Sequence, residues 1–554
     1  MPEITSLPKT YRISKPRVDG AQAAHAVDDV DLDAVAAQIE SLAQAFGMLD
    51  EDGKTIPAAE VEQTLENSRR GKHTIVAKMT DKVRSQIEKL HGDSLLVVED
   101  VVIDPMRGGT FDEMVLPMNH FPVDTDQELS FKIRVEGPDG QKISGAKVSL
   151  QGGIWYDEGL TSAKGLVTLV MYEETPDSLR RLIIKPVDGY WSRVVERPAL
   201  VAGQINTIKL VPLGEGLGQP NFPQTQLQSW GMTDMGLTPS TAAAVPVRVA
   251  VIDSGIDASH PDLAPGTGRD FGESDAPDQS WSNDGSGHGT HVAGMIAGLD
   301  NAMGVVGGTA AGAQVFANRV FPNARISKLI AAIDWCIDNE IDVVNMSLGG
   351  KASDQGFEDA LLDAQDAGIL CVAATGNAAT DVMYPAKYAS VLAVAALGKL
   401  GSFPDDSSFA GQVSDKTAGA YFAASFTCFG PEVDVCAPGV AIVSTLPGGG
   451  HAPWSGTSMA CPHVAAFAAR LLQERSDLRD MPRNASRAKA LFQAVKDSCV
   501  DLGLPPEYQG AGLPSLRSDL PPPPAPPTPD TVASAESRAV DMIDAAITLL
   551  TEPA

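Results

Sequence analysis

Between about residues 230 and 516, short apolar runs alternate with helical patterns, and this alternation constrains the possible folds more than any other feature of the chain. The runs include VRVAVID at 247–253, DVVNMSL at 342–348 and ILCVAAT at 369–375. Most runs are almost continuously apolar, as expected for strands that helices cover on both faces. The segment therefore predicts an α/β domain built on a parallel sheet.

Composition restricts the partners of the chain. Its 42 basic and 71 acidic residues give a formal charge of −29, which opposes broad contact with nucleic acid or anionic membranes. No window of about 20 residues is apolar enough to span a bilayer, and Met1–Gly20 lacks the apolar core of an export signal. The six cysteines lack metal-type C-x-x-C pairs, and we expect buried free thiols. We therefore predict no nucleic-acid partner, no membrane span and a cytoplasmic location, with secretion by an unconventional route as the alternative.

The N-terminal half predicts two further units. The first is residues 1–125, in which residues 21–67 have an acidic, helix-like pattern and residues 73–104 follow a strand, helix, strand order. The second is residues 126–213, where short alternating stretches separated by glycine and proline turns indicate a small all-β sandwich module. A stretch rich in glycine, proline and glutamine at 214–228 then marks the boundary with the α/β domain.

The α/β domain is expected over residues 214–517, and a proline-rich run follows it. The run PPPPAPPTP at 521–529 predicts a stiff, extended spacer. A helical pattern at 533–550 places on one face the apolar residues Val540, Ile543, Ile547 and Leu550. We expect residues 518–554 to form this linker and a C-terminal helix that binds protein, either the body of the chain or a partner.

Three motifs carry residue types that act together in nucleophilic catalysis. Asp253 ends the apolar run VAVID, and a glycine turns the chain two residues later. His288 stands between glycines in GHGTHVAG, at the opening of an apolar helix where little side-chain bulk crowds the ring. Ser458 lies in GTSMACPHV at another helix start, where backbone N–H groups favour an anion. Each motif alone also fits a structural role, as a loop cap or helix cap, so the three must be interpreted together.

The order Asp253, His288, Ser458, with these surrounding motifs, resembles the subtilisin-like serine proteases. The resemblance covers roughly residues 225–515 and extends through VNMSLG, AATGN and YPA further along the chain. It implies a subtilisin-like catalytic domain and an endopeptidase that hydrolyses protein and peptide substrates. The alternative is a catalytically silent binding or scaffolding protein on the same fold, which the intact set of motifs argues against.

The resemblance assigns a role to each catalytic side chain. Ser458 attacks the peptide carbonyl after His288, acting as the base, removes the hydroxyl proton. Asp253 holds the imidazole in the required tautomer and stabilises its charged form, and His288 then protonates the leaving amine. The side-chain amide of Asn377 and the backbone N–H of Ser458 stabilise the oxyanion of the acyl-enzyme pathway.

The resemblance also indicates where substrate binds. Ser347, Leu348 and Gly349, together with the segment that contains Ala374, look like the two segments that line the primary pocket and pair with extended substrate. Met383 stands before a Tyr-Pro pair, where the best-known family members carry glycine. Met383 either narrows the pocket and favours small substrate side chains, or swings aside without effect.

A structural calcium site is implied by the same resemblance, because hard oxygen ligands suit calcium. The implied ligands are the side chains of Asp262 and Asn301, the backbone carbonyls of Leu299, Met303 and Val305, and the side chain of Gln226. The alternative is a plain surface turn. We expect no redox or nucleotide cofactor.

The N-terminal half suggests a zymogen. Subtilisin-like enzymes are commonly made with an N-terminal pro-region that assists folding and blocks the cleft, and residues 73–104 resemble part of such an inhibitor. We therefore expect the N-terminal region to inhibit its own catalytic domain. The sandwich module, which looks like carboxypeptidase-regulatory or fibronectin-like domains, lies between the two, and we expect the activating cleavage in the linker at 214–225. The alternative is that the N-terminal half is a passive spacer.

Overall fold

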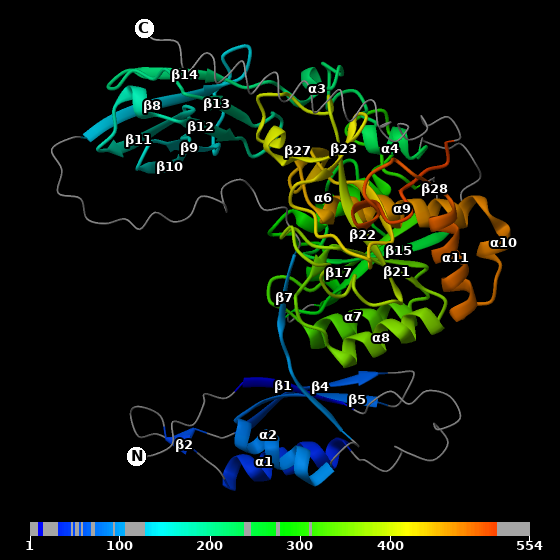
Figure 1. Cartoon of the computed structure of the whole chain (residues 1–554). Helices are drawn as coiled ribbons and strands as arrows, with labels where there is room; N and C mark the ends of the chain where they lie inside the picture. The colour runs from blue at the N-terminus through cyan, green and yellow to red at the C-terminus, as the bar shows by residue number, and fades with distance from the viewer. Residues whose placement is uncertain are drawn as a thin grey trace, which may run out of the picture.

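Three parts follow one another along the chain: an N-terminal α/β region, a β module and a larger α/β domain (Figure 1). The computed structural model describes residues 9–14, 32–45, 48–49, 55–56, 59–67, 72–91, 95–105, 128–237, 245–272, 277–309 and 313–517. The proline-rich linker and C-terminal helix predicted at 518–554 lie outside the described residues.

The large domain is built on a nine-stranded sheet, ordered β16-β17-β15-β19-β21-β22-β24-β23, with β25 also paired to β22. The strands span Thr267–Asp270 (β16), Ala313–Arg319 (β17), Val247–Asp253 (β15), Val343–Met346 (β19), Leu370–Ala374 (β21), Val391–Lys399 (β22), Tyr421–Ala424 (β24), Val413–Ala418 (β23) and Val435–Pro438 (β25). The pairs from β16 to β22 and the β22–β25 pair are parallel, which confirms the parallel sheet predicted from the sequence. The hairpin of β23 and β24 adds an antiparallel edge, because a short turn can join only antiparallel neighbours.

Helices cover both faces of this sheet. Helices α6 (His288–Ala297) and α9 (Thr457–Glu474) pack against each other on one side, and α7 (Ile326–Asp338) and α8 (Gln355–Asp366) lie on the other (Figure 1). A further helix, α11 (Ala485–Asp497), contacts both α8 and α9. Because both faces are covered, every residue of β19 and β21 is buried, whichever way its side chain points.

The N-terminal region is a four-stranded sheet packed against two helices. The sheet order is β4-β5-β1-β6, and its strands span Lys9–Ser14 (β1), Ala59–Asn67 (β4), Lys72–Met79 (β5) and Leu96–Glu99 (β6). Helices α1 (Leu32–Ala45) and α2 (Asp81–His91) share with this sheet a core that includes Ile39, Ile75 and Ile87.

The helix predicted from the pattern at 21–67 is wrong at the C-terminal end of this range. Residues 59–67 form strand β4, and the short strands Met48–Leu49 (β2) and Thr55–Ile56 (β3) pair with each other. The antiparallel ladder with β5 satisfies the backbone groups of β4, and this tertiary pairing outweighs a weak local periodicity.

The β module consists of two sheets around one core. The sheets have the orders β10-β9-β12-β13 and β11-β8-β14. Their strands span Glu128–Glu136 (β8), Lys147–Gln151 (β9), Tyr156–Leu160 (β10), Leu166–Tyr172 (β11), Arg181–Lys185 (β12), Arg193–Glu196 (β13) and Ile205–Lys209 (β14). Residues of both sheets, among them Ile133, Leu150 and Leu182, form a shared hydrophobic cluster. All pairs are antiparallel except β14 with β8, which run parallel.

The stretch that follows the module is packed rather than extended. Leu213, Phe222 and Leu227 are buried in the same hydrophobic cluster as β15 of the large domain. Trp191 of the β module, which is 1% exposed, belongs to this cluster too. These buried side chains anchor the connecting stretch to the large domain, because burying apolar surface is favourable, while residues 218–221 between them are exposed.

Two further expectations concern the surface and the thiols. Within the described ranges, no helix combines the length and the apolar character that crossing a membrane requires. All six cysteines are free, with Cys499 half-buried and the others buried, as the sequence analysis expected.

Candidate active site

Asp253 is the last residue of β15, and its side chain is fully buried. One carboxylate oxygen accepts hydrogen bonds from the backbone N–H of Ser254, at 2.7 Å, and from its hydroxyl, at 3.1 Å. Nδ1 of His288 lies 2.8 Å from each of the two carboxylate oxygens. Because an ionised carboxylate can only accept, the contact places the proton on Nδ1 and leaves Nε2 as the basic nitrogen.

His288 opens α6, and glycines make room for it. Gly287 precedes the helix with a φ of 75°, in the left-handed region that glycine adopts without strain. A Cβ atom on Gly289 would lie only 2.1 Å from the carbonyl oxygen of Gly255. Glycine at this position therefore lets α6 approach the end of β15 closely enough for the imidazole to reach Asp253.

Asp284 ties the loops around His288 together, and sequence reasoning missed it. Its Oδ1 accepts from the hydroxyl of Ser254 and the N–H of Gly287, both at 2.8 Å. Its Oδ2 accepts from the N–H of Thr290 at 2.8 Å and from the Thr290 hydroxyl at 2.6 Å. The available signal was an aspartate four residues before His288, at the entrance to a helix where such side chains act as caps.

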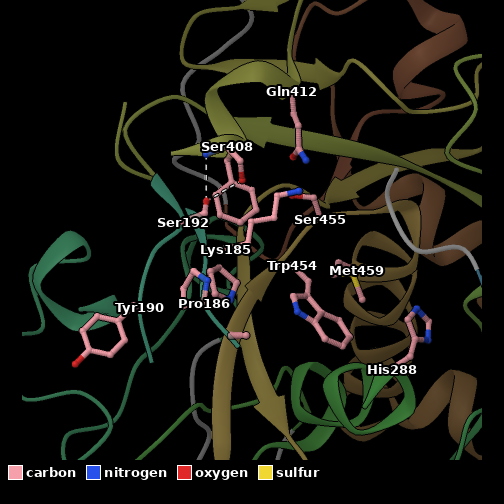
Figure 2. Close-up of a pocket in the computed structure, with 13 residues that line it drawn as sticks. Lys185, Pro186, Tyr190, Ser192, His288, Ser408, Gln412, Trp454, Ser455 and Met459 are labelled. Carbon is pink, nitrogen blue, oxygen red and sulfur yellow. Dashed lines mark hydrogen bonds between the residues drawn. The ribbon is translucent and has the colours of Figure 1, made fainter. Parts of the chain in front are cut away.

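Aromatic and neutral groups surround the outer side of the imidazole. The ring of Trp454 stacks on His291, with centroids 4.6 Å apart, and lies 6.4 Å from the ring of His288. Burial lowers the pKa of His291 to about 3, so this neighbour stays neutral and adds no positive charge beside His288. Trp454 and His288 also line a cavity of about 270 Å³ that extends to the β module (Figure 2).

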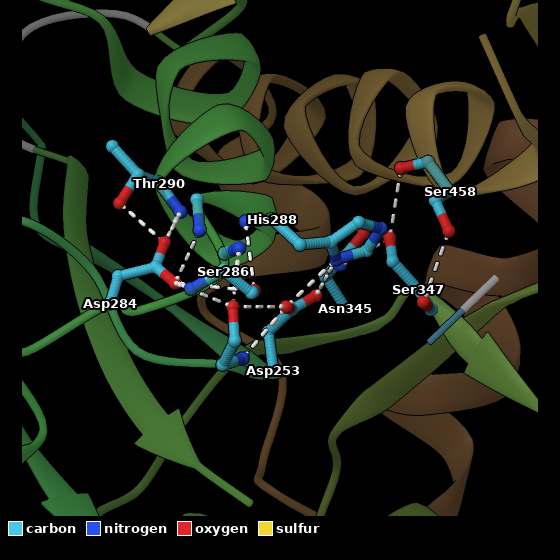
Figure 3. Close-up of polar contacts among 11 residues, drawn as sticks. Asp253, Asp284, Ser286, His288, Thr290, Asn345, Ser347 and Ser458 are labelled. Carbon is cyan, nitrogen blue, oxygen red and sulfur yellow. Dashed lines mark hydrogen bonds and ion pairs between the residues drawn. The ribbon is translucent and has the colours of Figure 1, made fainter. Parts of the chain in front are cut away.

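Ser458 is the second residue of α9 and is fully buried. Its hydroxyl donates to the carbonyl of Ser347 at 3.1 Å, and the Ser347 hydroxyl donates to the carbonyl of Ser458 at 3.0 Å. Figure 3 shows the imidazole of His288 between Asp253 and Ser458. Nε2 of His288 has no hydrogen-bond partner among the described atoms. In this structure the Ser458 hydroxyl therefore bonds to Ser347 and not to Nε2 of His288.

Asn377 follows β21 and lies at the N-terminus of α9. Its Oδ1 accepts from the backbone N–H of Thr457 at 2.8 Å and from the Thr457 hydroxyl at 2.9 Å. These two bonds fix the orientation of the amide, because the oxygen and the NH₂ group lie on opposite sides of one carbon. The NH₂ group and the N–H of Ser458, in the first turn of α9, are the two donors that the sequence analysis assigned to an oxyanion.

The N-terminal region inserts a strand beside this site. Strand β7 (Val102–Pro105) pairs antiparallel with β20 (Leu348–Gly349), with Pro105 opposite Leu348 and Asp104 opposite Gly349. On its other edge β7 pairs with β18 (Ala324–Arg325), so it is the central strand of a three-stranded sheet. The segment predicted to bind substrate therefore holds a strand of the chain itself, directly after Ser347.

The other two residues predicted to bind substrate are both buried. Ala374 ends β21 and is fully buried, and Met383 is 9% exposed. The Cγ and Sδ atoms of Met383 lie 3.0 Å from the position that a Cβ atom on Gly376 would take. Met383 thus fills the space beside the backbone that leads to Asn377.

Four of the predicted calcium ligands form one cluster. The side-chain amide of Gln226 donates to the carbonyl of Leu299 at 2.7 Å and to that of Met303 at 3.5 Å. Oδ1 of Asn301 accepts from the N–H of Met303 at 3.1 Å. The two carbonyls therefore converge on one polar centre, which the Gln226 side chain occupies.

Asp262 and Val305, the remaining predicted ligands, meet a histidine that the sequence analysis did not include. Oδ2 of Asp262 accepts from the N–H of Val305 at 2.9 Å and lies 2.7 Å from Nε2 of His451. Burial alone would raise the pKa of Asp262, but the bonds from His451 and Val305 outweigh it and lower the pKa. In the part of the chain that the structure describes, no three or more His, Cys, Asp and Glu side chains gather to hold a metal. Calcium here would depend on carbonyl and amide oxygens around one carboxylate.

Comparison with known proteins places the large domain in a family. Residues 246–512 match the model of the Subtilase family. Over 258 residues, 45% of this chain, the sequence is 40% identical to a subtilisin of Bacillus pumilus, and the match covers 83% of that protein. It is also 40% identical to Subtilisin NAT of Bacillus subtilis subsp. natto, of which it covers 60%. A thermostable alkaline protease of Halalkalibacterium halodurans is 38% identical over 270 residues, 48% of this chain and 65% of the relative.

The match covers only part of these two relatives and only part of this chain. The chain spans less than two thirds of the length of Subtilisin NAT and of the alkaline protease. The family match begins at residue 246, so the N-terminal region and the β module lie outside it.

Proposed function

Because the chain belongs to the subtilase family, we propose that it is a serine endopeptidase that hydrolyses peptide bonds in protein and peptide substrates. The observation that carries this proposal is the buried 2.8 Å contact between Asp253 and Nδ1 of His288, on the far side of the ring from Ser458 (Figure 3). A carboxylate, an imidazole and a hydroxyl in this order turn a weak nucleophile into a strong one.

Each step uses a group whose position supports the proposal. Nε2 of His288 takes the hydroxyl proton of Ser458 as Oγ bonds to the substrate carbonyl carbon, and Asp253 stabilises the resulting imidazolium. The oxyanion is held by the side-chain amide of Asn377 and the N–H of Ser458. His288 then gives the proton to the leaving amine, the C–N bond breaks, and an acyl-enzyme remains. Water, activated by the same imidazole, hydrolyses the ester and restores the serine.

Active-site labelling tests this proposal. A fluorophosphonate probe is expected to label the wild-type chain and to leave Ser458→Ala unlabelled. Ser162→Ala removes an exposed hydroxyl of the β module and should be labelled like wild type. Absence of labelling in the wild type, even after limited proteolysis of the N-terminal region, would instead favour the silent scaffolding protein.

We also propose that the N-terminal region inhibits the catalytic domain until it is cleaved. Strand β7 lies where the substrate strand is expected, between β18 and β20. Asp100, just before β7, accepts from the N–H of Ser327 at 2.9 Å and from its hydroxyl at 2.7 Å, at the start of α7. These bonds hold the inserted strand against the large domain and support inhibition over a passive spacer.

The register of β7 points to a cleavage site other than the linker at 214–225. Pro105 stands opposite Leu348, the residue after Ser347, and the carbonyl of Ser347 accepts the hydroxyl of Ser458. Met106 follows Pro105 in the sequence, and we propose that it is the residue before the scissile bond. We therefore expect cleavage between Met106 and Arg107. The linker is anchored at Phe222, which is 9% exposed within the core, and residues 218–221 beside it are exposed. Cleavage after Met106 leaves the β module attached to the mature catalytic domain.

A structural calcium ion near Asp262 is a further part of the proposal. The donor chemistry fits, because the carbonyls of Leu299 and Met303 converge on the amide of Gln226, and a turn of that amide adds its oxygen to the set. Bound calcium would link these loops and raise the free energy of unfolding.

Thermal unfolding tests the calcium site. We expect calcium to raise the Tm of the exhaustively chelated chain, and Asp262→Asn to weaken this dependence. Asp300→Asn, a change at an exposed neighbouring carboxylate, should keep it. An identical Tm with and without calcium would leave a plain surface turn.

A further inference from the structure

The cavity beside His288 is shared between two parts of the chain. It measures about 270 Å³, and its lining includes His288, Trp454 and Met459 of the large domain. Pro186 and Tyr190 of the β module line it as well. In Figure 2, His288 lies at one end of the labelled residues and Tyr190 at the other, with Trp454 and Pro186 between them. Most lining side chains are apolar or aromatic, which is typical of cavities that bind ligand side chains.

The part of the β module that lines the cavity, here called the module wall, is held in place by both chain neighbours of Tyr190. The N–H of Gly189 donates to the carbonyl of His451 at 2.9 Å. Trp191 is buried, and its ring meets that of Phe409 edge to face with centroids 5.9 Å apart. Tyr190 between them therefore cannot move away from the large domain without breaking these contacts.

Further contacts extend this junction along β13. The hydroxyls of Ser192 and Ser408 lie 2.7 Å apart, and Arg193 forms an ion pair with Asp406 at 3.2 Å. The hydroxyl of Tyr190 points the other way, donating to Gln141 within the module at 3.2 Å. The module therefore fixes the aromatic ring, and its neighbours Gly189 and Trp191 hold this part of the module against the large domain.

The direction of β7 shows which part of a substrate faces the cavity. Residues before the scissile bond take the place of β7 between β18 and β20, and that strand ends beside Ser347. The leaving amine must lie next to His288, which protonates it. His288 and Met459, the residue after Ser458, are both in the cavity lining, so the cavity begins where the leaving segment begins.

We propose that the β module forms one wall of the site that binds the substrate residues after the scissile bond, with Pro186 and Tyr190 selecting large apolar or aromatic side chains there. This inference rests on the proposed peptidase function and deepens it. Trp454 and Phe409 supply the facing apolar surface, and the fixed module wall closes a space that the large domain alone would leave open. The module is then a specificity element of the mature enzyme.

Paired peptide substrates test the proposal on the activated chain. The peptides share one sequence before the scissile bond and carry either glycines or leucine and phenylalanine in the first three positions after it. We expect wild type to prefer the apolar set in kcat/KM, and Tyr190→Ala to reduce that preference about ten-fold. Tyr190→Phe keeps the ring and should retain the preference. Leu160→Ala changes an exposed apolar residue of the module, 67% exposed and outside the cavity lining, and should also retain it.

A methyl ester substrate with the same residues before the bond separates the peptidase function from the role of the module, because its leaving group, methanol, is too small to reach the module wall. All four proteins should cleave it equally. If none does, the proposed peptidase function fails. If all do and Tyr190→Ala keeps the wild-type preference for apolar leaving residues, the proposed role of the module is overturned. If Tyr190→Ala does not fold, Pro186→Gly tests the same role. It should show the same loss of preference for apolar residues after the scissile bond.

Discussion

Arg12 and Asp354 form a buried ion pair at 2.5 Å across the boundary between the N-terminal region and the large domain, with side chains 1% and 7% exposed. Asp354 is also the N-cap of α8, where it accepts from the N–H of Phe357 at 2.9 Å. One carboxylate therefore stabilises both a helix of the large domain and the docking of the N-terminal region.

Replacing Arg12 is expected to loosen the contact between the N-terminal region, which we propose to be an inhibitor, and the large domain. Breaking one side of a buried pair typically costs about 3–5 kcal/mol, because the remaining charge is left buried. We expect Arg12→Met to raise the initial peptidase activity of the uncleaved chain and to speed its self-processing. Lys9→Met is the control. Lys9 lies in β1 like Arg12, but its ion pair with Glu99 is exposed, so this variant should behave like wild type. Equal activity of both variants would contradict the role given to Arg12.

Asn377→Ala should lower turnover without abolishing labelling by a fluorophosphonate. In a subtilisin, loss of one such oxyanion donor lowers kcat about 100- to 1000-fold, and we expect a similar loss here. Thr457→Val removes one of the two bonds that orient the amide and should cause a much smaller loss. Steady-state kinetics on a peptide substrate distinguish the two, and a kcat for Asn377→Ala near that of wild type would remove this residue from the mechanism.

Acid should destabilise the fold partly through His463. Burial lowers its pKa to about 4, and its Nδ1 lies 2.7 Å from the carbonyl of Met459. In the unfolded chain His463 binds a proton near pH 6.5, whereas in the folded chain it does so only near pH 4. The contribution of neutral His463 to the free energy of unfolding is therefore complete above pH 6.5 and is lost as pH falls toward about 4. In the Ser458→Ala background, His463→Gln should make the pH dependence of the unfolding free energy shallower by about 1 kcal/mol per pH unit between these values. An unchanged slope, measured by urea unfolding, would argue against a buried neutral histidine.

Self-processing should produce a new N-terminus at Arg107. Incubation of the purified wild-type chain followed by N-terminal sequencing measures this directly, and Ser458→Ala should stay intact. The β module and the large domain are expected in one polypeptide after the cut. A first N-terminus between residues 214 and 225 would show that the linker is the processing site after all.

Met383→Gly should change selectivity before the scissile bond. Met383 fills the space beside Gly376, so its removal is expected to open the primary pocket and to raise kcat/KM for large side chains relative to alanine about ten-fold. Profiling with a peptide library checks this, with the preference after the scissile bond as the internal control. The same profile in both proteins would mean that Met383 swings aside.

The catalytic side chains could be predicted because each belongs to a local pattern. Asp253 ends a continuously apolar run, and both His288 and Ser458 open helices whose glycines remain visible in the sequence. Parallel strands bring their carboxyl ends to one edge of the sheet, and the resemblance to a known family then placed these three groups in one site. The cytoplasmic location and the protein-binding C-terminal helix stay predictions.

The parts that could not be predicted depend on contacts between distant segments. Asp284 acts by bridging Ser254 and Thr290, and only the folded loops bring these groups together. Strand β4 forms because β5 pairs with it. The pairing of β7 with β20 joins residues more than two hundred positions apart. Local periodicity carries no information about such pairings, which tertiary structure decides.

The burial of Trp191 in the core of the large domain changes how the molecule can be divided. A shortened chain that starts at residue 214 would carry a hole lined by Phe409 and its neighbours, facing water with an apolar floor. The β module and the large domain should therefore unfold as one cooperative unit. Exchanging either part would require redesign of the interface residues on the other part.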